Sequence, residues 1–341
     1  MLLHADMPTD AAAFLAAIEP YRDDLVIGVE GIFTWYWLAD LCAREGIAFV
    51  LGHALYMKAI HGTKSKNDRI DALKIAKLTA SGMLPQAYVY PREMRATRDL
   101  MRRRLHLVRK RGQLLAHIEN TYHQHNIVRP GGRIAYKSNR AGLGLGFADA
   151  STAKSVDVDL TLLDGYDEII RDTELFLANR AKHHDANAFH LLRTVPGIGK
   201  ILAMTILYEI HDIKRFERVQ DFASYSRLVR GTKSSAGKKT GSSGGKMGKV
   251  HLKWAFSEAA VLFLAKCEKG KTLRARLARK HGKAKSLSIL AHKIGRAVYY
   301  MLSREQAFDL SASWPPPDPE KRVSPKANSS NVGRTRCRLA E

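Results

Sequence analysis

Apolar residues in the first 90 positions fall into short runs and longer amphipathic stretches that alternate along the chain. Residues 25–29 and 47–51 are short apolar runs of the kind that form buried strands. Residues 35–45 and 68–81 show helical spacing, and a glycine follows each of them. Strands that alternate with helices predict an α/β unit in which helices cover a sheet.

The pattern changes after residue 91, where apolar positions take up near-heptad spacing over residues 92–127. Arginine and lysine occupy the other faces, which predicts a long basic helix with a coiled-coil-like seam. The seam comprises Met101, Leu105, Val108, Leu115 and Tyr122. Residues 160–183 predict a second helix, with one apolar stripe formed by Leu163, Tyr166, Ile170 and Leu177. We expect the two helices to form an antiparallel hairpin, joined by an irregular connection over residues 129–157.

The last third of the chain predicts a helical domain and a tail. Apolar patterning indicates a helix at 201–210 and further helices near 251–266 and 284–303. Proline, serine and charged residues predominate near the C-terminus, which predicts a disordered tail. The expected units are therefore 1–91, 92–187, 188–308 and 309–341, and the fold class is α/β followed by α.

Charge narrows the choice of partners. The 341 residues include 56 Lys and Arg against 33 Asp and Glu, a formal net charge of +23. A surplus of this size favours nucleic acid as the partner, with a membrane surface as the alternative. No run of about 18 apolar residues is present to span a bilayer. The three cysteines lack zinc or disulfide spacing, so we expect a cytoplasmic, nucleoid-associated protein.

The most basic stretch, residues 230–253, reads RGTKSSAGKKTGSSGGKMGKVHLK and has no acidic residue. Its small and charged side chains cannot form a core, so we expect a mobile loop that binds phosphate groups. The lysines expected to contact nucleic acid are Lys233, Lys238, Lys239, Lys246 and Lys249. A serine here could attack a phosphodiester if it were activated, although passive phosphate binding explains the same composition.

Three carboxylates form a candidate metal site. Glu30 ends the first predicted strand, and Asp68 and Asp71 lie three residues apart at a predicted helix start. If they converge, their oxygen atoms suit Mg²⁺. The alternative interpretation is that the two aspartates only stabilise the positive end of the helix dipole.

Two further features could bind a nucleic-acid backbone. Residues 196–199, Pro-Gly-Ile-Gly, resemble the turn of a helix-hairpin-helix, in which Gly197, Gly199 and Lys200 would approach a phosphate at a helix N-terminus. A helix-capping turn without a ligand explains the same residues. On the long basic helix we expect contacts from Arg102, Arg103, Arg104 and Arg109.

Several of these motifs, in this order, resemble the DEDD insertion-sequence transposases of the IS110/IS1111 type. Residues 29–35 are similar to the family's second acidic motif, and residues 64–72 to its third and fourth. Residues 195–199 are similar to the start of its C-terminal transposase domain. Residues 233–238, 244–248 and 252–258 resemble its serine motif and the helix that follows. The resemblance covers nearly the whole of residues 1–305.

The resemblance implies a RuvC-like RNase H fold, a coiled-coil insertion and a helical C-terminal domain. It implies Mg²⁺ held by acidic residues, of which Glu30, Asp68 and Asp71 match three. It also implies that a serine becomes covalently linked to DNA, with Ser235 the best match and Ser234 the second. The partners implied are DNA at element ends and target, a structured guide RNA and further copies of the chain.

One departure from the family pattern concerns its first acidic residue, an Asp at the end of the first strand. Neither Asp6 nor Asp10 follows an apolar strand, so we expect that strand and its Asp to be missing and cleavage by this chain to be impaired. Two other functions stay open at this point. One is a non-catalytic DNA- or RNA-binding remnant, and the other is a Holliday-junction-type nuclease that uses carboxylates alone.

Overall fold

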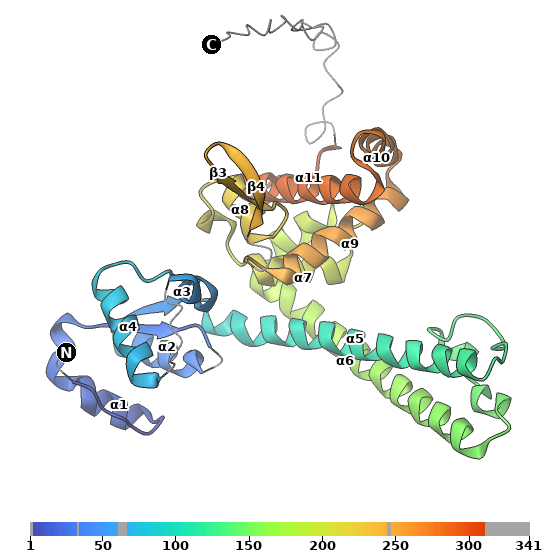
Figure 1. The fold of residues 1–341 in the computed structure, drawn as a ribbon, viewed down its shortest axis with the longest axis horizontal. Helices are drawn as coiled ribbons and strands as arrows, with labels where there is room; N and C mark the ends of the chain where they lie inside the picture. Colours follow the sequence, from blue (N-terminus) through green and yellow to red (C-terminus); the bar gives the residue numbers. More distant parts are fainter. Residues whose placement is uncertain (1–2, 33, 61–66, 244–246, 311–341) are drawn as a thin grey trace, which may run out of the picture.

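The computed structural model describes residues 3–32, 34–60, 67–243 and 247–310, and this part of the chain is mostly helical (Figure 1). An α/β unit lies at the N-terminus, a long helical arm follows, and a helical domain completes the described chain. Short 3₁₀ helices occur at Glu19–Asp24, Lys137–Asn139, Leu143–Gly146 and Ile213–Arg215. No helix within the described ranges is long and apolar enough to cross a membrane.

The N-terminal unit is built on two parallel strands. Strand β1 (Val26–Glu30) pairs with β2 (Ala48–Gly52) in a register that sets Val26 opposite Ala48 and Glu30 opposite Gly52. Helix α2 (Trp35–Arg44) connects the strands, as a parallel pair requires. The two predicted strands and this helix are confirmed to within two residues at each end.

Helix α4 (Asp68–Ala80) lies directly against β1, and glycine makes this possible. A Cβ atom at Gly28 would lie 2.2 Å from Thr79 Oγ1 and 3.3 Å from Ile75 Cγ2. Helices α1 (Ala11–Ile18) and α3 (Ala54–Ile60) also belong to this unit and were not predicted. In the described residues the unit is therefore a small parallel sheet covered by helices. This confirms an α/β unit, and the more specific RuvC-like fold stays a prediction.

The arm consists of α5 (Arg92–Gln124) and α6 (Ala150–Arg193), which run side by side (Figure 1). Met101, Leu105 and Tyr122 of α5 are buried, as are Leu163 and Leu177 of α6, so the predicted apolar seams do pack. The irregular connection is shorter than predicted. Helix α6 already begins at Ala150 because the side chain of Asp149 caps it, accepting a hydrogen bond from the Thr152 amide.

Helix α6 is interrupted close to the C-terminal domain. Asp185 has φ −160° and ψ 89°, which breaks the helical path. Its Oδ1 atom accepts a hydrogen bond from the Ala188 amide at 2.8 Å, so the last turns of α6 start with a cap of their own. Next to the break, His184 Nδ1 lies 2.8 Å from the Tyr208 hydroxyl, which ties the arm to helix α7.

The C-terminal domain packs α7 (Lys200–Ile210), α9 (Val250–Lys266) and α11 (Lys283–Arg304) around one core, with α8 (Val219–Tyr225) and α10 (Glu268–His281) beside it. Tyr208, Phe222, Phe256 and Phe263 are fully buried there. The helices predicted at 201–210, 251–266 and 284–303 are confirmed. The predicted disordered tail lies outside the described residues from position 311 onward.

The basic stretch was expected to be a loop, and this prediction is wrong for most of it. Strands β3 (Gly231–Ser235) and β4 (Lys238–Ser243) form an antiparallel hairpin. Ala236 and Gly237 connect the strands with φ values of +48° and +74°. A two-residue connection with both φ values positive is a type I′ turn, whose twist matches that of paired strands. Turn geometry therefore produces strands where the strand propensity of the sequence is low.

Candidate nucleic-acid cleft and serine hairpin

A cleft of about 2200 Å³ separates the N-terminal unit from the C-terminal domain. The N-terminal side contributes aromatic residues, including Trp35, Tyr36 and Tyr88, while α5 and the C-terminal domain contribute most of the charge. The basic residues that line it are Arg98, Arg102, Arg215, Arg227, Arg230, Lys249, Lys253 and Lys285. Only Asp99 and Asp221 are acidic among the lining residues. A concave basic surface with aromatic side chains suits a nucleic-acid backbone and its bases.

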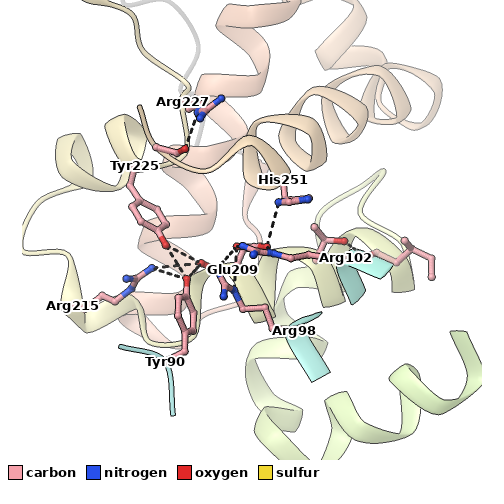
Figure 2. A network of polar contacts seen from close by, with 11 residues as sticks. Tyr90, Arg98, Arg102, Glu209, Arg215, Tyr225, Arg227 and His251 are labelled. Carbon is pink, nitrogen blue, oxygen red and sulfur yellow. Dashed lines mark hydrogen bonds and ion pairs between the residues drawn. The ribbon is translucent and has the colours of Figure 1, made fainter. Parts of the chain in front are cut away.

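A buried carboxylate organises one wall of this cleft. Glu209 on α7 has a side chain that is 3% exposed, and Figure 2 shows Arg98 and Arg102 of α5 converging on it. Arg102 Nε donates to Glu209 Oε1 at 2.6 Å and Arg102 Nη2 donates to Oε2 at 2.9 Å. Arg98 Nη2 donates to Oε2 at 3.3 Å. Burial alone would raise the pKa of Glu209, but these arginines outweigh it and the pKa is lowered.

The same wall is fixed by tyrosines. The hydroxyl of Tyr90 donates to the backbone oxygen of Glu209 at 2.8 Å and lies 2.8 Å from the hydroxyl of Tyr225. The Arg98 guanidinium stacks on the Tyr90 ring at 3.8 Å, and Arg215 lies 4.5 Å from the centre of the Tyr225 ring. Burial raises the pKa of Tyr90, so its hydroxyl keeps its proton and the network stays intact at physiological pH. The network joins the start of the arm to the C-terminal domain.

Lys249 lies at the start of α9, where this wall meets the end of the serine hairpin segment. Its amide donates to the Tyr225 backbone oxygen at 2.6 Å. The preceding Gly248 has φ +84°, and a Cβ there would lie 2.5 Å from the same oxygen. Burial, and next the charge of Arg98, lower the pKa of Lys249 to about 8. The charged form of a partly buried lysine among arginines would be stabilised by a nearby anion such as a phosphate.

The candidate serines lie at the tip of the hairpin. Ser235 pairs with Lys238 and Ser234 pairs with Lys239 across the two strands, and both serines are exposed. Successive side chains on a strand point to opposite faces, so the two serines face opposite sides of the hairpin. Arg230 and Gly231, at its base, line the cleft. Of the predicted lysines here, Lys238 is exposed, the side chains of Lys233 and Lys239 are not described, and Lys246 lies outside the described residues.

The three candidate metal ligands lie on adjacent elements. Glu30 ends β1, and the next residue, Gly31, lines the cleft. Asp68 and Asp71 lie in the first turn of α4, where Asp68 is exposed and Asp71 pairs with Lys74 at 3.4 Å. Asp71 shares a helical stripe with Ile75 and Thr79, which contact β1 at Gly28.

Carboxylate oxygens are the right donors for a hard cation. Within the described residues, however, no three acidic, histidine or cysteine side chains are close enough together to hold an ion. The structure thus places the carboxylates on neighbouring elements without gathering them into a coordination site.

The other predicted nucleic-acid contacts divide into paired and exposed groups. Arg102 lines the cleft but is bound to Glu209, and Arg104 is bound to Glu174. Arg103 and Arg109 are exposed on the arm.

The Pro-Gly-Ile-Gly turn has a packing role. Gly197 is buried at φ +92°, and a Cβ there would lie 2.5 Å from the Phe263 amide nitrogen. It therefore fits the turn against α9, while Gly199 and Lys200 are exposed at the start of α7.

Sequence reasoning missed the network around Glu209. One signal was available, because Glu209 is the only acidic residue in the otherwise apolar helix α7. A single carboxylate in a helix that is buried all round must find a partner, and arginines in the long basic helix were the obvious donors. Tyr90 and Tyr225 gave no comparable signal.

Two family models match the chain. Residues 2–127 match a family model described as a transposase of the DEDD, IS110 type. Residues 189–277 match the model of the transposase IS116/IS110/IS902 family. No curated protein matches the chain. The two matches lie in the order that the sequence motifs require. The chain belongs to the IS110-type insertion-sequence transposases, the proteins of DNA transposition and recombination.

Proposed function

We propose that the protein cleaves and exchanges DNA strands by attack of Ser235 on a phosphodiester held in the cleft, beside Mg²⁺ bound by Glu30, Asp68 and Asp71. One observation carries the proposal. The same cleft is lined by Gly31, which follows Glu30, and by Arg230 and Gly231 at the base of the serine hairpin. A DNA strand in the cleft would therefore pass between the carboxylates and the serines.

The chemistry requires a bond exchange at phosphorus. The Ser235 oxygen would form a bond to phosphorus while the bond to one deoxyribose oxygen breaks, and the proton lost by serine is balanced by the proton gained by the leaving oxygen. The product is a phosphoserine ester, which keeps a phosphodiester bond for rejoining to a new strand. Cleft cations such as Lys249 and Lys253 would stabilise the extra negative charge on the phosphate in the transition state.

The metal would supply charge neutralisation at the phosphate oxygens. Glu30 would hold it from the strand end, and Asp68 and Asp71 from the first turn of α4. Asp71 would exchange its pairing with Lys74 for the ion. The family resemblance adds a structured guide RNA, assembly into a homo-oligomer and a place on the nucleoid. The prediction of impaired cleavage stays a prediction.

The decisive experiment compares wild type with Ser235→Ala and Ser234→Ala on labelled DNA with Mg²⁺, using denaturing gels to detect a protein–DNA adduct. We expect Ser235→Ala to abolish the adduct and Ser234→Ala to retain it. Ser242→Ala, on the opposite strand of the hairpin, is the matched control. An adduct formed by Ser235→Ala would disprove the serine assignment, and an unaltered yield with Glu30→Gln would disprove the metal assignment.

A second candidate function is a nucleic-acid-binding protein without cleavage activity. It is favoured by the lack of a gathered carboxylate cluster in the described part of the chain. Salt-dependent DNA binding with no cleavage by wild type would support it. Cleavage without an adduct would instead indicate a carboxylate nuclease.

A further inference from the structure

The two sides of the cleft present different kinds of side chain. Among the described residues of the N-terminal unit that line it, none is Asp, Glu, Lys or Arg. Three apolar residues on this side, Ile32, Leu55 and Tyr56, line the cleft and are 41% to 48% exposed. We call these three residues the apolar face. In a chain with a net charge of +23, an uncharged and partly exposed apolar face within a cleft indicates a surface for a ligand.

The apolar face lies where the two parallel strands end. Ile32 follows β1, and Tyr56 lies in the first turn of α3, just after β2 (Figure 1). The Gly31 amide donates to the Gly52 oxygen at 2.8 Å, which joins the two strand ends. Ligands of parallel α/β sheets commonly bind at this carboxyl edge of the strands. Glu30 ends β1 at the same edge, so the apolar face lies beside one of the proposed metal ligands.

Tyr56 is held in place by His53. The Tyr56 amide donates to the His53 oxygen at 2.9 Å, and the two rings meet edge to face with their centres 4.7 Å apart. His53 is anchored in turn, because its amide donates to the Pro85 oxygen at 2.7 Å. Burial, and next the charge of Lys249, lower the pKa of His53, so its ring is uncharged at physiological pH. The apolar face therefore includes a positioned aromatic ring with an uncharged neighbour.

The opposite side of the cleft supplies positive charge. The C-terminal domain contributes Arg230, Lys253 and Lys285 to the lining. An unpaired nucleotide strand matches this division, because its bases stack on aromatic and apolar side chains while its phosphates require cations. In a duplex the base faces are covered by one another, and the outside presents phosphates and polar groove edges. Placing those polar groups against the apolar face would cost desolvation without a compensating hydrogen bond.

We propose that the cleft binds an unpaired segment of a DNA strand, with its bases on the apolar face and its phosphates toward the C-terminal domain. Tyr56 provides the stacking surface for a base, and Ile32 and Leu55 extend it. The identity of the strand as DNA rests on the proposed function. The inference adds the form in which that DNA is bound: a duplex must open locally before it can occupy the cleft.

The test compares two labelled probes, an oligothymidylate and a mixed-sequence duplex of the same length, by fluorescence anisotropy in EDTA. Tyr56→Ala should weaken binding of the oligothymidylate about tenfold, the effect of losing one stacked base, and should change duplex binding by less than about twofold. The slope of log affinity against log salt should not change, because no phosphate contact is lost. Tyr56→Trp should retain the affinity, since an indole also stacks. Leu55→Ser is a second variant, for which we expect a smaller loss with the same preference.

Tyr136→Ala is the matched control, because Tyr136 is 61% exposed and does not line the cleft. It should bind both probes as the wild type does. Equal losses on the two probes, or no loss with Tyr56→Ala and Leu55→Ser, would overturn the proposal. A loss seen with oligouridylate and not with oligothymidylate would overturn the assignment to DNA.

The outcome of this test is separate from that of the cleavage experiment. Binding in EDTA requires neither metal nor cleavage, so failure of the Ser235 or metal assignment leaves the expected affinities unchanged. A protein–DNA adduct that depends on Ser235, together with equal binding of both probes by wild type and Tyr56→Ala, would overturn this inference alone.

Discussion

The arginines of helix α5 and the cations of the cleft differ in what neutralises them. Those of α5 are largely bound to carboxylates of neighbouring elements: Arg95 to Asp40, Arg98 and Arg102 to Glu209, Arg104 to Glu174, and Arg111 to Asp167. In contrast, Arg230, Lys253 and Lys285 line the cleft without an ion pair to any described residue. The sequence predicts nucleic-acid contacts from α5 as well as from residues 230–253, yet much of the charge of α5 holds the molecule together. The cations free to bind a polyanion lie mainly in the C-terminal domain.

The largest effect should come from removing the carboxylate that neutralises α5. We expect Glu209→Gln to lower the free energy of unfolding by about 3–5 kcal/mol, because the buried Arg98 and the partly buried Arg102 would lose their counter-charge. Urea denaturation measures the change. Glu268→Gln is the control, because Glu268 and its partner Lys271 have side chains that are 83% and 51% exposed, and it should cost about 1 kcal/mol or less. Similar losses of unfolding free energy for both variants would contradict the expectation that the buried ion pairs stabilise the fold more than the surface ion pairs.

The next effect concerns DNA affinity. Lys253→Ala combined with Lys285→Ala should weaken binding at low salt and reduce the slope of log affinity against log salt by about 2, one for each phosphate contact. Arg104→Ala should leave the slope nearly unchanged, because Glu174 already neutralises that arginine. Fluorescence anisotropy at several salt concentrations measures the slopes. A larger loss from Arg104→Ala would mean that the arm, and not the cleft, is the principal binding surface.

A smaller effect should appear with pH. Lys249 has a pKa lowered to about 8, so in the free protein it loses its charge as the pH rises through 8. DNA affinity should then fall by about tenfold between pH 7 and pH 9, the effect of losing one charge-assisted hydrogen bond. Lys249→Arg should remove this dependence, since arginine stays charged. An identical pH profile for both proteins would exclude Lys249 as the titrating contact.

The pH dependence of folding stability has the opposite sign to the pH dependence of DNA affinity. The folded-state pKa lies below the ordinary value of 10.5, so the unfolded chain binds more protons over this range. The contribution of Lys249 to stability therefore improves as the pH rises from about 8 to 10.5.

The smallest effect belongs to the hairpin turn. Ala236 has φ +48°, a conformation that costs an L-residue with a Cβ about 1 kcal/mol. Ala236→Gly should therefore strengthen the hairpin and slow hydrogen exchange of its amides by up to about fivefold. The Glu209 network should be unaffected, because it lies on other elements. Faster exchange in the glycine variant would show that the added freedom of the unfolded chain outweighs the relieved strain.

The local spacing of apolar residues was sufficient to predict the helices and strands that bury one face. The strands around Gly28 and Leu51 and the two arm helices follow from apolar spacing, because burial of a face determines each of them. The hairpin could not be predicted in this way, since Lys233, Ser234 and Ser235 have no apolar alternation and positive φ values at Ala236 and Gly237 were not foreseen. The Glu209 network could not be predicted in full because Arg98 and Arg102 lie more than one hundred residues from Glu209 in the sequence. The position of Asp71 relative to Glu30 could not be predicted either. It depends on how α4 packs on β1 at Gly28, and the sequence alone does not show that packing.

The break at Asp185 has a mechanical consequence. From Ala150 to the break, helix α6 is about 35 residues long, or roughly 50 Å at 1.5 Å per residue. The arm is thus a lever whose pivot lies beside the C-terminal domain, with its far end projecting well beyond both domains (Figure 1). A rotation of about 10° at the pivot would carry the far end through about 9 Å. Ångström-scale adjustments of the cleft wall, to which α5 is bound through Glu209, are therefore magnified at the tip into displacements the size of a nucleotide step or more.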